Sequence, residues 1–158
     1  MVAGEQRQPM TELQKVDRTL LAALIRDGRM SLTDLAEQVD LSVSAVHQRV
    51  RRLEKQGLIT GYVAHVRPDL VGLPLTAFVS ITPTDHSAPD DAPERLARFE
   101  AIEACHSVAG EESYILKVRV ASPEKLELLL QEIRAAAGVS TRTTVVLSTP
   151  YEHRPLPL

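Results

Sequence analysis

The segment from Ser42 to Gly57 restricts the fold most, because it carries a helix start, a helix end and one apolar stripe. Ser42 is a preferred N-cap residue, and Gly57 is the residue type that most readily takes a left-handed conformation beyond a helix end. Between them, Val46, Val50 and Leu53 follow the i, i+4, i+7 spacing of a buried helix face. The segment therefore predicts an amphipathic helix with one exposed face.

That exposed face is polar and basic. Its N-terminal half offers short polar side chains and its C-terminal half offers cations, an arrangement that suits contacts to base edges followed by contacts to phosphates. A helix fits the DNA major groove, about 12 Å wide, where Gln and Arg make bidentate contacts to bases. The alternative is a solvated basic face without a partner. The candidate DNA-binding residues are Ser42, Ser44, His47, Gln48, Arg51, Arg52 and Lys55.

Two shorter helical patterns precede this segment. Asp17 is expected to cap the first helix and Gly28 to end it, while Ser31 with Asp34 forms a shortened capping box for the second. An Asp-Leu-Ser turn starting at Asp40 joins the second helix to the third. Three helices with a tight turn between the last two are typical of a helix-turn-helix.

Residues 58–66 alternate between apolar and polar types and are expected to form a strand, followed by a hinge over 67–74. From residue 75 the pattern becomes strand, helix, strand, strand, helix, strand. This βαββαβ order is that of the ferredoxin-like fold, with both helices on one face of an antiparallel sheet. We therefore predict an α+β protein: a helix-turn-helix (winged-helix-like) domain over 1–66 and a ferredoxin-like βαββαβ domain over 75–158. The expected strands are 75–83, 103–110, 112–121 and 139–151, and the expected helices are 93–102 and 122–137.

Apolar residues fall on both faces of the predicted sheet. Tyr114 and Leu116 are expected to face the helices, whereas Phe78, Ile115 and Val146 belong to the other face. A second face of this kind is commonly buried against another copy of the chain, which predicts a homodimer. The alternative is that scattered exposed apolar residues need no partner.

Charge is distributed unevenly along the chain. Residues 1–66 hold 9 Lys/Arg and 8 Asp/Glu, whereas residues 67–158 hold 9 and 13, so a polyanion is expected to meet the first part. A single cysteine excludes an internal disulfide and a cysteine zinc cage. No window approaches the roughly 18 apolar residues of a membrane span, and no secretory signal is evident, so we expect a cytoplasmic protein without a membrane partner.

Enzymatic chemistry finds little support in the sequence. Cys105 and His106 are strand neighbours whose side chains point to opposite faces, so they cannot pair as nucleophile and base. The acidic and histidine residues of 85–91 lie in a Pro-containing loop without metal-ligand spacing, and no nucleotide-binding glycine motif is present. We expect no catalytic residue, no metal and no cofactor.

Several motifs resemble those of the Lrp/AsnC "feast/famine" transcription regulators, in the correct order from about Val16 to Thr149. The resemblance implies a helix-turn-helix joined to an amino-acid-sensing βαββαβ domain, dimerisation through the sheet, and higher homo-oligomers such as octamers around which DNA wraps. Asp40 and Val43 depart from the Gly and Pro usual in the family's turn. The motifs are 41–46, 49–54, 57–59, 61–62, 108–110 and 141–143, together with Asp17-Arg18, Asp27-Gly28-Arg29 and Leu35-Ala36.

By the same resemblance, a loop met by the last strand of a neighbouring subunit holds the effector's α-amino and α-carboxyl groups. Carboxylates suit an ammonium group and hydroxyls suit a carboxylate, and Gly110 allows close backbone approach. Many relatives read Gly-Asp-Tyr-Asp-Tyr here, so Ser113 removes one ammonium partner, which Glu111 or Glu112 can replace. Equally, the two glutamates fit a solvated hairpin tip. The candidate effector-binding residues are Gly110, Glu111, Glu112, Ser113, Tyr114, Thr141 and Thr143.

The sequence thus favours a sequence-specific DNA-binding transcriptional regulator that responds to a small metabolite, namely an amino acid. Its expected partners are double-stranded DNA, the amino-acid effector and further copies of itself. Two alternatives stay open. One is a constitutive architectural DNA-binding protein without an effector, and the other is a small-molecule-binding protein whose N-terminal helices only mediate assembly.

Overall fold

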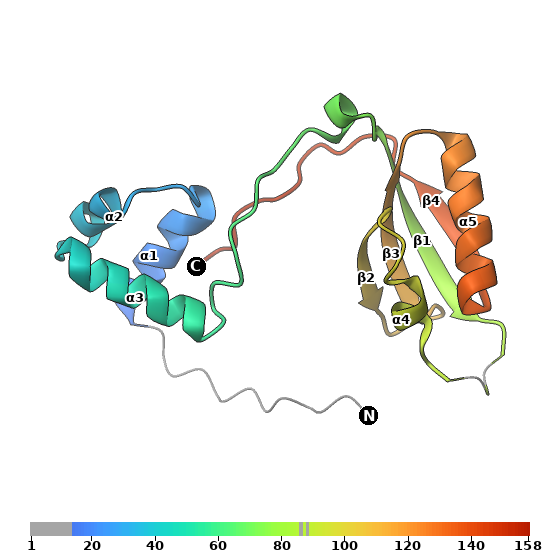
Figure 1. Cartoon of the computed structure of the whole chain (residues 1–158), viewed down its shortest axis with the longest axis horizontal. Coiled ribbons are helices and arrows are strands. Elements are labelled where there is room, and N and C mark those ends of the chain that lie inside the picture. Colours follow the sequence, from blue (N-terminus) through green and yellow to red (C-terminus); the bar gives the residue numbers. More distant parts are fainter. Residues whose placement is uncertain (1–13, 86, 88) are drawn as a thin grey trace. The chain divides into compact units, whose positions relative to one another are not determined.

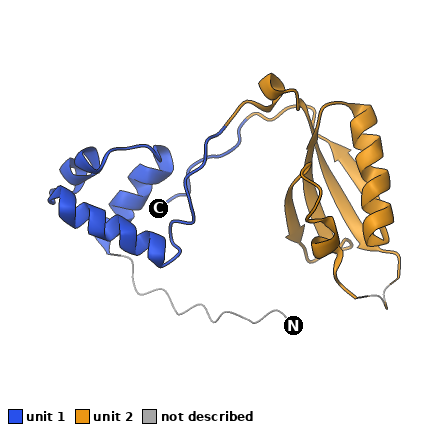
Figure 2. Cartoon of the chain, viewed as in Figure 1, with its two compact units in different colours: residues 1–65, 151–158 blue, residues 66–150 orange. Residues whose placement is uncertain are grey.

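The computed structural model describes residues 14–85, 87 and 89–158, which form two compact units (Figure 1, Figure 2). The first unit comprises the chain up to His65 together with Tyr151–Leu158, and the second comprises Val66–Pro150. This division differs from the predicted one at both ends of the second unit. Residues 66–74 group with the sheet, and the C-terminal segment groups with the helices.

The first unit is built on three helices: α1 over Lys15–Arg26, α2 over Leu32–Val39 and α3 over Val43–Lys55 (Figure 1). Their apolar stripes meet in one core, where Leu20, Leu35 and Val46 are almost completely buried. The burial of Val46, Val50 and Leu53 on α3 matches the predicted inward face. The helix-turn-helix arrangement is therefore confirmed.

The predicted caps of α2 and α3 are present. The Oγ of Ser31 accepts a 3.1 Å hydrogen bond from the backbone N–H of Asp34 and donates to the Asp34 carboxylate. The Oγ of Ser42 accepts a 3.2 Å hydrogen bond from the N–H of Ala45. Between the two helices Asp40 has a φ of 51°, the left-handed conformation that the tight turn requires.

The predicted cap of α1 is wrong. The helix starts at Lys15, and Gln14 occupies the N-cap position without a side-chain cap. Asp17 lies within the first turn and is 3% exposed. Its two carboxylate oxygens contact Arg49 at 3.0 Å and Arg52 at 2.7 Å. Because two guanidinium groups satisfy the carboxylate, it links α1 to α3 instead of capping a helix end.

The strand predicted over residues 58–66 is also absent from the structure, although Gly57 ends α3 with a φ of 72° as expected. An extended segment needs a hydrogen-bonded neighbour to become a strand. The neighbouring C-terminal segment contains Pro155 and Pro157, which have no N–H to donate. The two segments meet through side chains instead, with the rings of His65 and His153 stacked at 4.1 Å.

The second unit is a four-stranded antiparallel sheet in the order β2-β3-β1-β4, with both helices on one face (Figure 1). This confirms the ferredoxin-like βαββαβ arrangement. A short 3-10 helix over Pro68–Val71 precedes the sheet. The elements are β1 Leu75–Pro83, α4 Ala92–Leu96, β2 Ile102–Ser107, β3 Tyr114–Val120, α5 Pro123–Ala137 and β4 Val139–Val145.

The core of this unit lies between the sheet and α5. Along β3, every second residue from Tyr114 to Val120 is buried, as the alternation predicts. From α5, Leu129 and Ile133 pack against them. Ser122 caps α5 by accepting a 3.3 Å hydrogen bond from Lys125 N–H, and Gly138 ends it in a left-handed conformation, as predicted.

Four elements of this unit fall short of the predicted bounds by two or more residues at an end. β2 ends at Ser107 instead of residue 110, and β3 starts at Tyr114 instead of residue 112. The helix expected over 93–102 ends at Leu96, because the chain then turns through hydrogen bonds from Phe99 N–H to Leu96 O and from Ile102 N–H to Phe99 O. The last strand ends at Val145, and the next N–H still donates to Thr76 O before the chain leaves the sheet.

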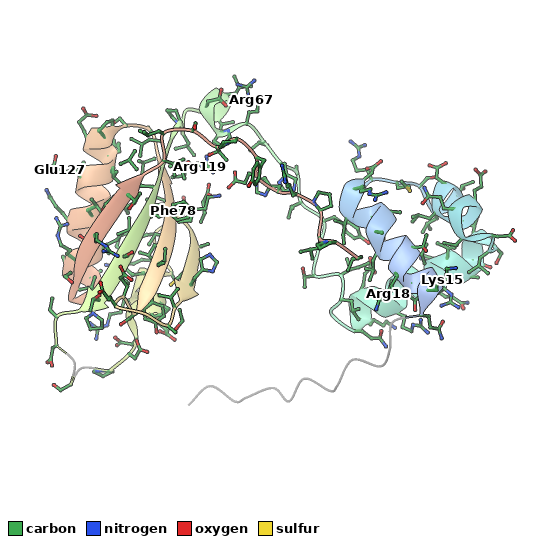
Figure 3. The ribbon with its side chains drawn as sticks, turned by 180° about the vertical axis from the view of Figure 1, so that it is seen from behind. Lys15, Arg18, Arg67, Phe78, Arg119 and Glu127 are labelled. Atoms are coloured by element: carbon green, nitrogen blue, oxygen red, sulfur yellow. The ribbon has the colours of Figure 1, made fainter. Side chains whose placement is uncertain are left out.

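The sheet face away from the helices is mixed. Phe78 is 42% exposed on it, and Ile115 is half-buried (Figure 3 labels Phe78). Beside them Lys117 and Arg119 form ion pairs with Glu103, the former at 3.3 Å. This open face therefore combines an apolar patch with a charged network.

None of the helices in the described part of the chain has both the length and the apolar character of a membrane span.

Candidate functional site

The outer face of α3 is the first candidate site. The buried positions Val46, Val50 and Leu53 fix the rotation of the helix, so most of the intervening polar residues point outward, whereas Arg49 turns toward Asp17. All seven predicted DNA-binding residues are exposed: Ser42, Ser44, His47, Gln48, Arg51, Arg52 and Lys55. The structure therefore leaves all seven accessible on α3 and its N-cap, and we call this set the α3 strip.

The members of the α3 strip differ in what else they contact. Ser42 serves as the N-cap, and its Oγ lies 3.2 Å from the Oγ of Ser44. Arg52 keeps 48% of its side chain exposed while it pairs with Asp17. Within the described part of the chain, neither Arg51 nor Lys55 forms a salt bridge. Arg51 and Lys55 are consequently the cations most available to an external anion.

A pocket of about 300 Å³ borders the α3 strip, and His47 and Arg51 are among the residues that line it. Tyr62 lines the same pocket and donates a 3.0 Å hydrogen bond from its hydroxyl to Glu54. Burial and this carboxylate raise the pKa of Tyr62. Tyr62 thus fastens the segment after α3 to the helix, a contact that periodicity could not reveal because Tyr62 lies outside any regular element.

The second candidate site is the loop over residues 110–114, between β2 and β3. Gly110 and Glu111 are exposed, and Ser113 is half-buried with its N–H donating to Ile81 O at 3.0 Å. Tyr114 is buried, and its hydroxyl donates a 2.8 Å hydrogen bond to Asp90. That hydrogen bond, with burial, raises the pKa of Tyr114 to about 12. Tyr114 therefore anchors the loop to the helix-covered side of the sheet.

Glu112 contacts a residue that the sequence pattern did not single out. Its side chain is 18% exposed, and the Arg142 guanidinium from β4 lies against its Oε1. Arg142 is paired in register with Ser80, which in turn is opposite Ile115. Since Ile115 alternates with the buried residues of β3, the Glu112–Arg142 pair lies on the open side of the sheet.

Thr141 and Thr143 lie on the other side. They are opposite Ile81 and Val79 of β1, both of which are buried beneath the helices. The Oγ1 of Thr141 accepts a 3.0 Å hydrogen bond from Arg134 of α5. Within one chain, β4 therefore turns Arg142, and not the two threonines, toward the Glu112 carboxylate. Arg142 could have been found from the sequence, because strand alternation places it on the opposite face from Thr141 and Thr143.

Cys105 and His106 occupy opposite faces of β2, as their partners Leu116 and Ile115 on β3 show. Burial raises the pKa of the Cys105 thiol, which disfavours the thiolate. Among the described residues, no group of three or more His, Cys, Asp or Glu side chains is arranged to hold a metal ion.

A helix-turn-helix unit with an exposed basic third helix, followed by a βαββαβ unit, defines a class of two-part transcription regulators. Residues 13–60 match the winged helix-turn-helix DNA-binding family, and residues 76–156 match the Lrp/AsnC ligand binding domain. The chain belongs to the Lrp/AsnC family of transcriptional regulators.

Three relatives illustrate the similarity. The HTH-type transcriptional regulator LrpA of Mycobacterium tuberculosis is 56% identical over 90% of this chain and 95% of its own length. A leucine-responsive regulatory protein of Serratia marcescens is 39% identical over 93% of this chain and 92% of its own length. The solved structure of a feast or famine regulatory protein from M. tuberculosis, complexed with L-methionine, has a TM-score of 0.90 at 55% identity, covering 91% of this chain and 98% of that one.

Proposed function

We propose that this chain is a sequence-specific DNA-binding transcriptional regulator whose βαββαβ unit responds to an amino acid. The observation that carries the proposal is the α3 strip, where a helix held by three buried apolar residues presents polar and cationic side chains to solvent. Membership of the Lrp/AsnC family supports the same function. So does the complex of a similar protein with L-methionine.

On DNA, the α3 strip is proposed to enter the major groove. Gln48 and Arg51 are suited to bidentate contacts with base edges, whereas Lys55 and Arg52 are suited to phosphates. Ser44 and His47 lie on the same exposed surface and complete the contact. Arg52 contributes only part of its charge, because Asp17 holds its guanidinium at 2.7 Å.

For the effector, the loop over 110–114 is proposed to hold the α-amino group. Glu112 is the better candidate for this role, since it is half-buried while Glu111 is exposed. A partly buried carboxylate gives a stronger charge-assisted hydrogen bond to an ammonium group than a fully solvated one. Gly110 allows close approach of a ligand to the backbone, and a methyl group placed there would be in van der Waals contact with Glu112 Oε2 at 4.0 Å.

The functional form is proposed to be a homodimer or a larger homo-oligomer. The open sheet face exposes Phe78, and the segment from Val63 to Leu73 exposes five large apolar side chains. Apolar groups that a single chain leaves exposed in this way favour burial against a second copy. A two-fold dimer would also match two half-sites on DNA.

Two measurements on the full-length chain test the proposal. Selection from a random DNA pool should enrich one short motif, and thermal melting against each of the twenty amino acids should reveal at least one that raises the melting temperature. Enrichment of no motif would favour the architectural alternative. DNA binding without any amino-acid response would remove the effector from the proposal and leave the DNA contact intact.

A further inference from the structure

Glu54 of α3 carries a carboxylate that helical spacing directs to Arg51. The two residues are three positions apart, where opposite charges on a helix attract each other. The other positions three or four residues from Glu54 hold Val50, Gly57 and Leu58, none of which is charged. Within the described part of the chain, however, no salt bridge joins Glu54 to Arg51. Another contact must therefore decide where this carboxylate lies.

Tyr62 supplies the contact that Glu54 makes instead. Its hydroxyl donates a 3.0 Å hydrogen bond to Oε1 of Glu54. Tyr62 belongs to the segment after α3, which forms no strand, so its ring is placed by side-chain contacts and not by a backbone ladder. The neutral hydroxyl leaves the charge of Glu54 unchanged but fixes the position of the carboxylate. Tyr62 therefore competes with Arg51 for the same carboxylate.

Gly28, in the turn between α1 and α2, gives the ring of Tyr62 its place. A methyl group built on Gly28 would lie 3.4 Å from Cδ1 of that ring, which is van der Waals contact. A larger side chain at this position would compete with the ring for the same space. Gly28, Arg51, Glu54 and Tyr62 also line one pocket of about 300 Å³. The ring thus lies between the α1–α2 turn and the C-terminal half of α3.

Resting on the DNA contact proposed above, we propose that Tyr62 is a positioning residue for DNA recognition, because its hydroxyl holds the Glu54 carboxylate away from Arg51. A guanidinium that pairs with a carboxylate has fewer N–H donors left for a base edge. With Glu54 engaged by Tyr62, the donors of Arg51 stay available. Gly28 belongs to the same arrangement, since it leaves room for the ring. Tyr62 acts through Glu54 and needs no contact with DNA itself.

The test measures DNA binding of the full-length protein by fluorescence anisotropy, with the motif enriched from the random pool. Tyr62→Phe keeps the ring and removes the hydroxyl. It should weaken binding by roughly two- to fivefold at low salt, the range that one exposed ion pair accounts for, and the ratio to wild type should approach one as salt screens the charges. Tyr151→Phe is the matched control, because Tyr151 is an exposed tyrosine of the same unit. It should bind like wild type.

Glu54→Gln separates this role from simple packing. The amide oxygen still accepts a hydrogen bond from Tyr62, but a neutral amide does not form an ion pair with Arg51. Tyr62→Phe should therefore cause no loss of DNA affinity when Glu54→Gln is also present. In the wild-type background, Tyr62→Phe should reduce sequence preference at the same base position as Arg51→Ala, and Glu54→Gln should restore that preference.

Equal losses from Tyr62→Phe with and without Glu54→Gln would mean that Tyr62 only packs, and the inference is overturned. Unchanged affinity and preference in Tyr62→Phe alone would overturn it as well. Thermal melting shows whether each variant folds. Should Tyr62→Phe fail to fold, Gly28→Val, which displaces the ring, must lose affinity and regain it with Glu54→Gln. A wild-type chain that selects no DNA motif would overturn the proposed function together with this inference, whereas equal losses overturn the inference alone.

Discussion

Asp17 shows how a single residue can be misassigned by local pattern and still matter for the site. The carboxylate is buried and bridges Arg49 and Arg52, so it helps to fix the rotation of α3 against α1. We predict that Asp17→Asn lowers the free energy of unfolding by about 2 kcal/mol, since a buried acceptor of two charged donors is lost. Urea denaturation is the measurement, with the exposed Glu37→Gln as the charge-matched control. Equal stability of the two variants would contradict the bridging role.

Tyr114 gives a prediction for alkaline pH. Its hydrogen bond to Asp90 and its burial raise the pKa of Tyr114 from 10.0 to about 12, so the folded chain holds this proton more tightly than the unfolded chain. The resulting stabilisation is complete below pH 10.0 and is lost as the pH rises through about 12. Tyr114→Phe should therefore be less stable than wild type by about 1 kcal/mol at neutral pH.

That difference should shrink as the pH rises above 10.0. Urea titrations at several pH values would measure it, with Tyr151→Phe as the matched control because Tyr151 is exposed. A Tyr114→Phe difference that does not change with pH would show that the hydroxyl proton is not linked to folding.

At the scale of elements, the α2–α3 turn depends on one left-handed residue. Asp40 has a φ of 51°, a conformation that aspartate tolerates and β-branched residues do not. We predict that Asp40→Val lowers the free energy of unfolding by about 1–2 kcal/mol, whereas Asp40→Gly leaves it unchanged or raises it slightly. Thermal melting of both variants measures this. Equal melting temperatures for the valine and glycine variants would exclude backbone strain at this turn.

Elements with both a start and a stop signal could be predicted from the sequence. The caps Ser42 and Ser122 lie where expected, because a cap is a contact within a few residues. Elements that depend on distant partners could not be predicted in the same way. Residues 58–66 alternate like a strand but have no neighbour that can complete a ladder. The helix expected over 93–102 ends early, because the chain must turn into β2.

The same distinction applies to the candidate site. The α3 strip follows from one helical period, and the structure exposes every predicted member. The effector loop lacks such a period, so its neighbour on β4 could be predicted only by resemblance. The family resemblance pointed to Thr141 and Thr143, whereas the structure turns Arg142 between them toward Glu112.

At the scale of the whole molecule, the open sheet face is the proposed dimer contact. We predict that Phe78→Glu raises the dimer dissociation constant roughly tenfold or more, since it places a charge in the middle of an apolar contact. Sedimentation velocity across a concentration series is the measurement. Leu128→Glu is the control, because Leu128 is exposed on α5 on the opposite side of the sheet. An unaltered monomer–dimer equilibrium in Phe78→Glu would place the dimer contact elsewhere.

The regulator function depends most directly on α3 facing DNA through Arg51. Fluorescence anisotropy with the selected DNA motif, at one fixed salt concentration, compares wild type with Arg51→Ala and with Arg98→Ala as the control. If Arg51 makes a bidentate contact to a base, Arg51→Ala should bind the DNA less tightly by about 1–3 kcal/mol and should lose sequence preference at one position. The control should bind like wild type. Unchanged affinity and preference in Arg51→Ala would contradict the placement of α3 in the DNA groove.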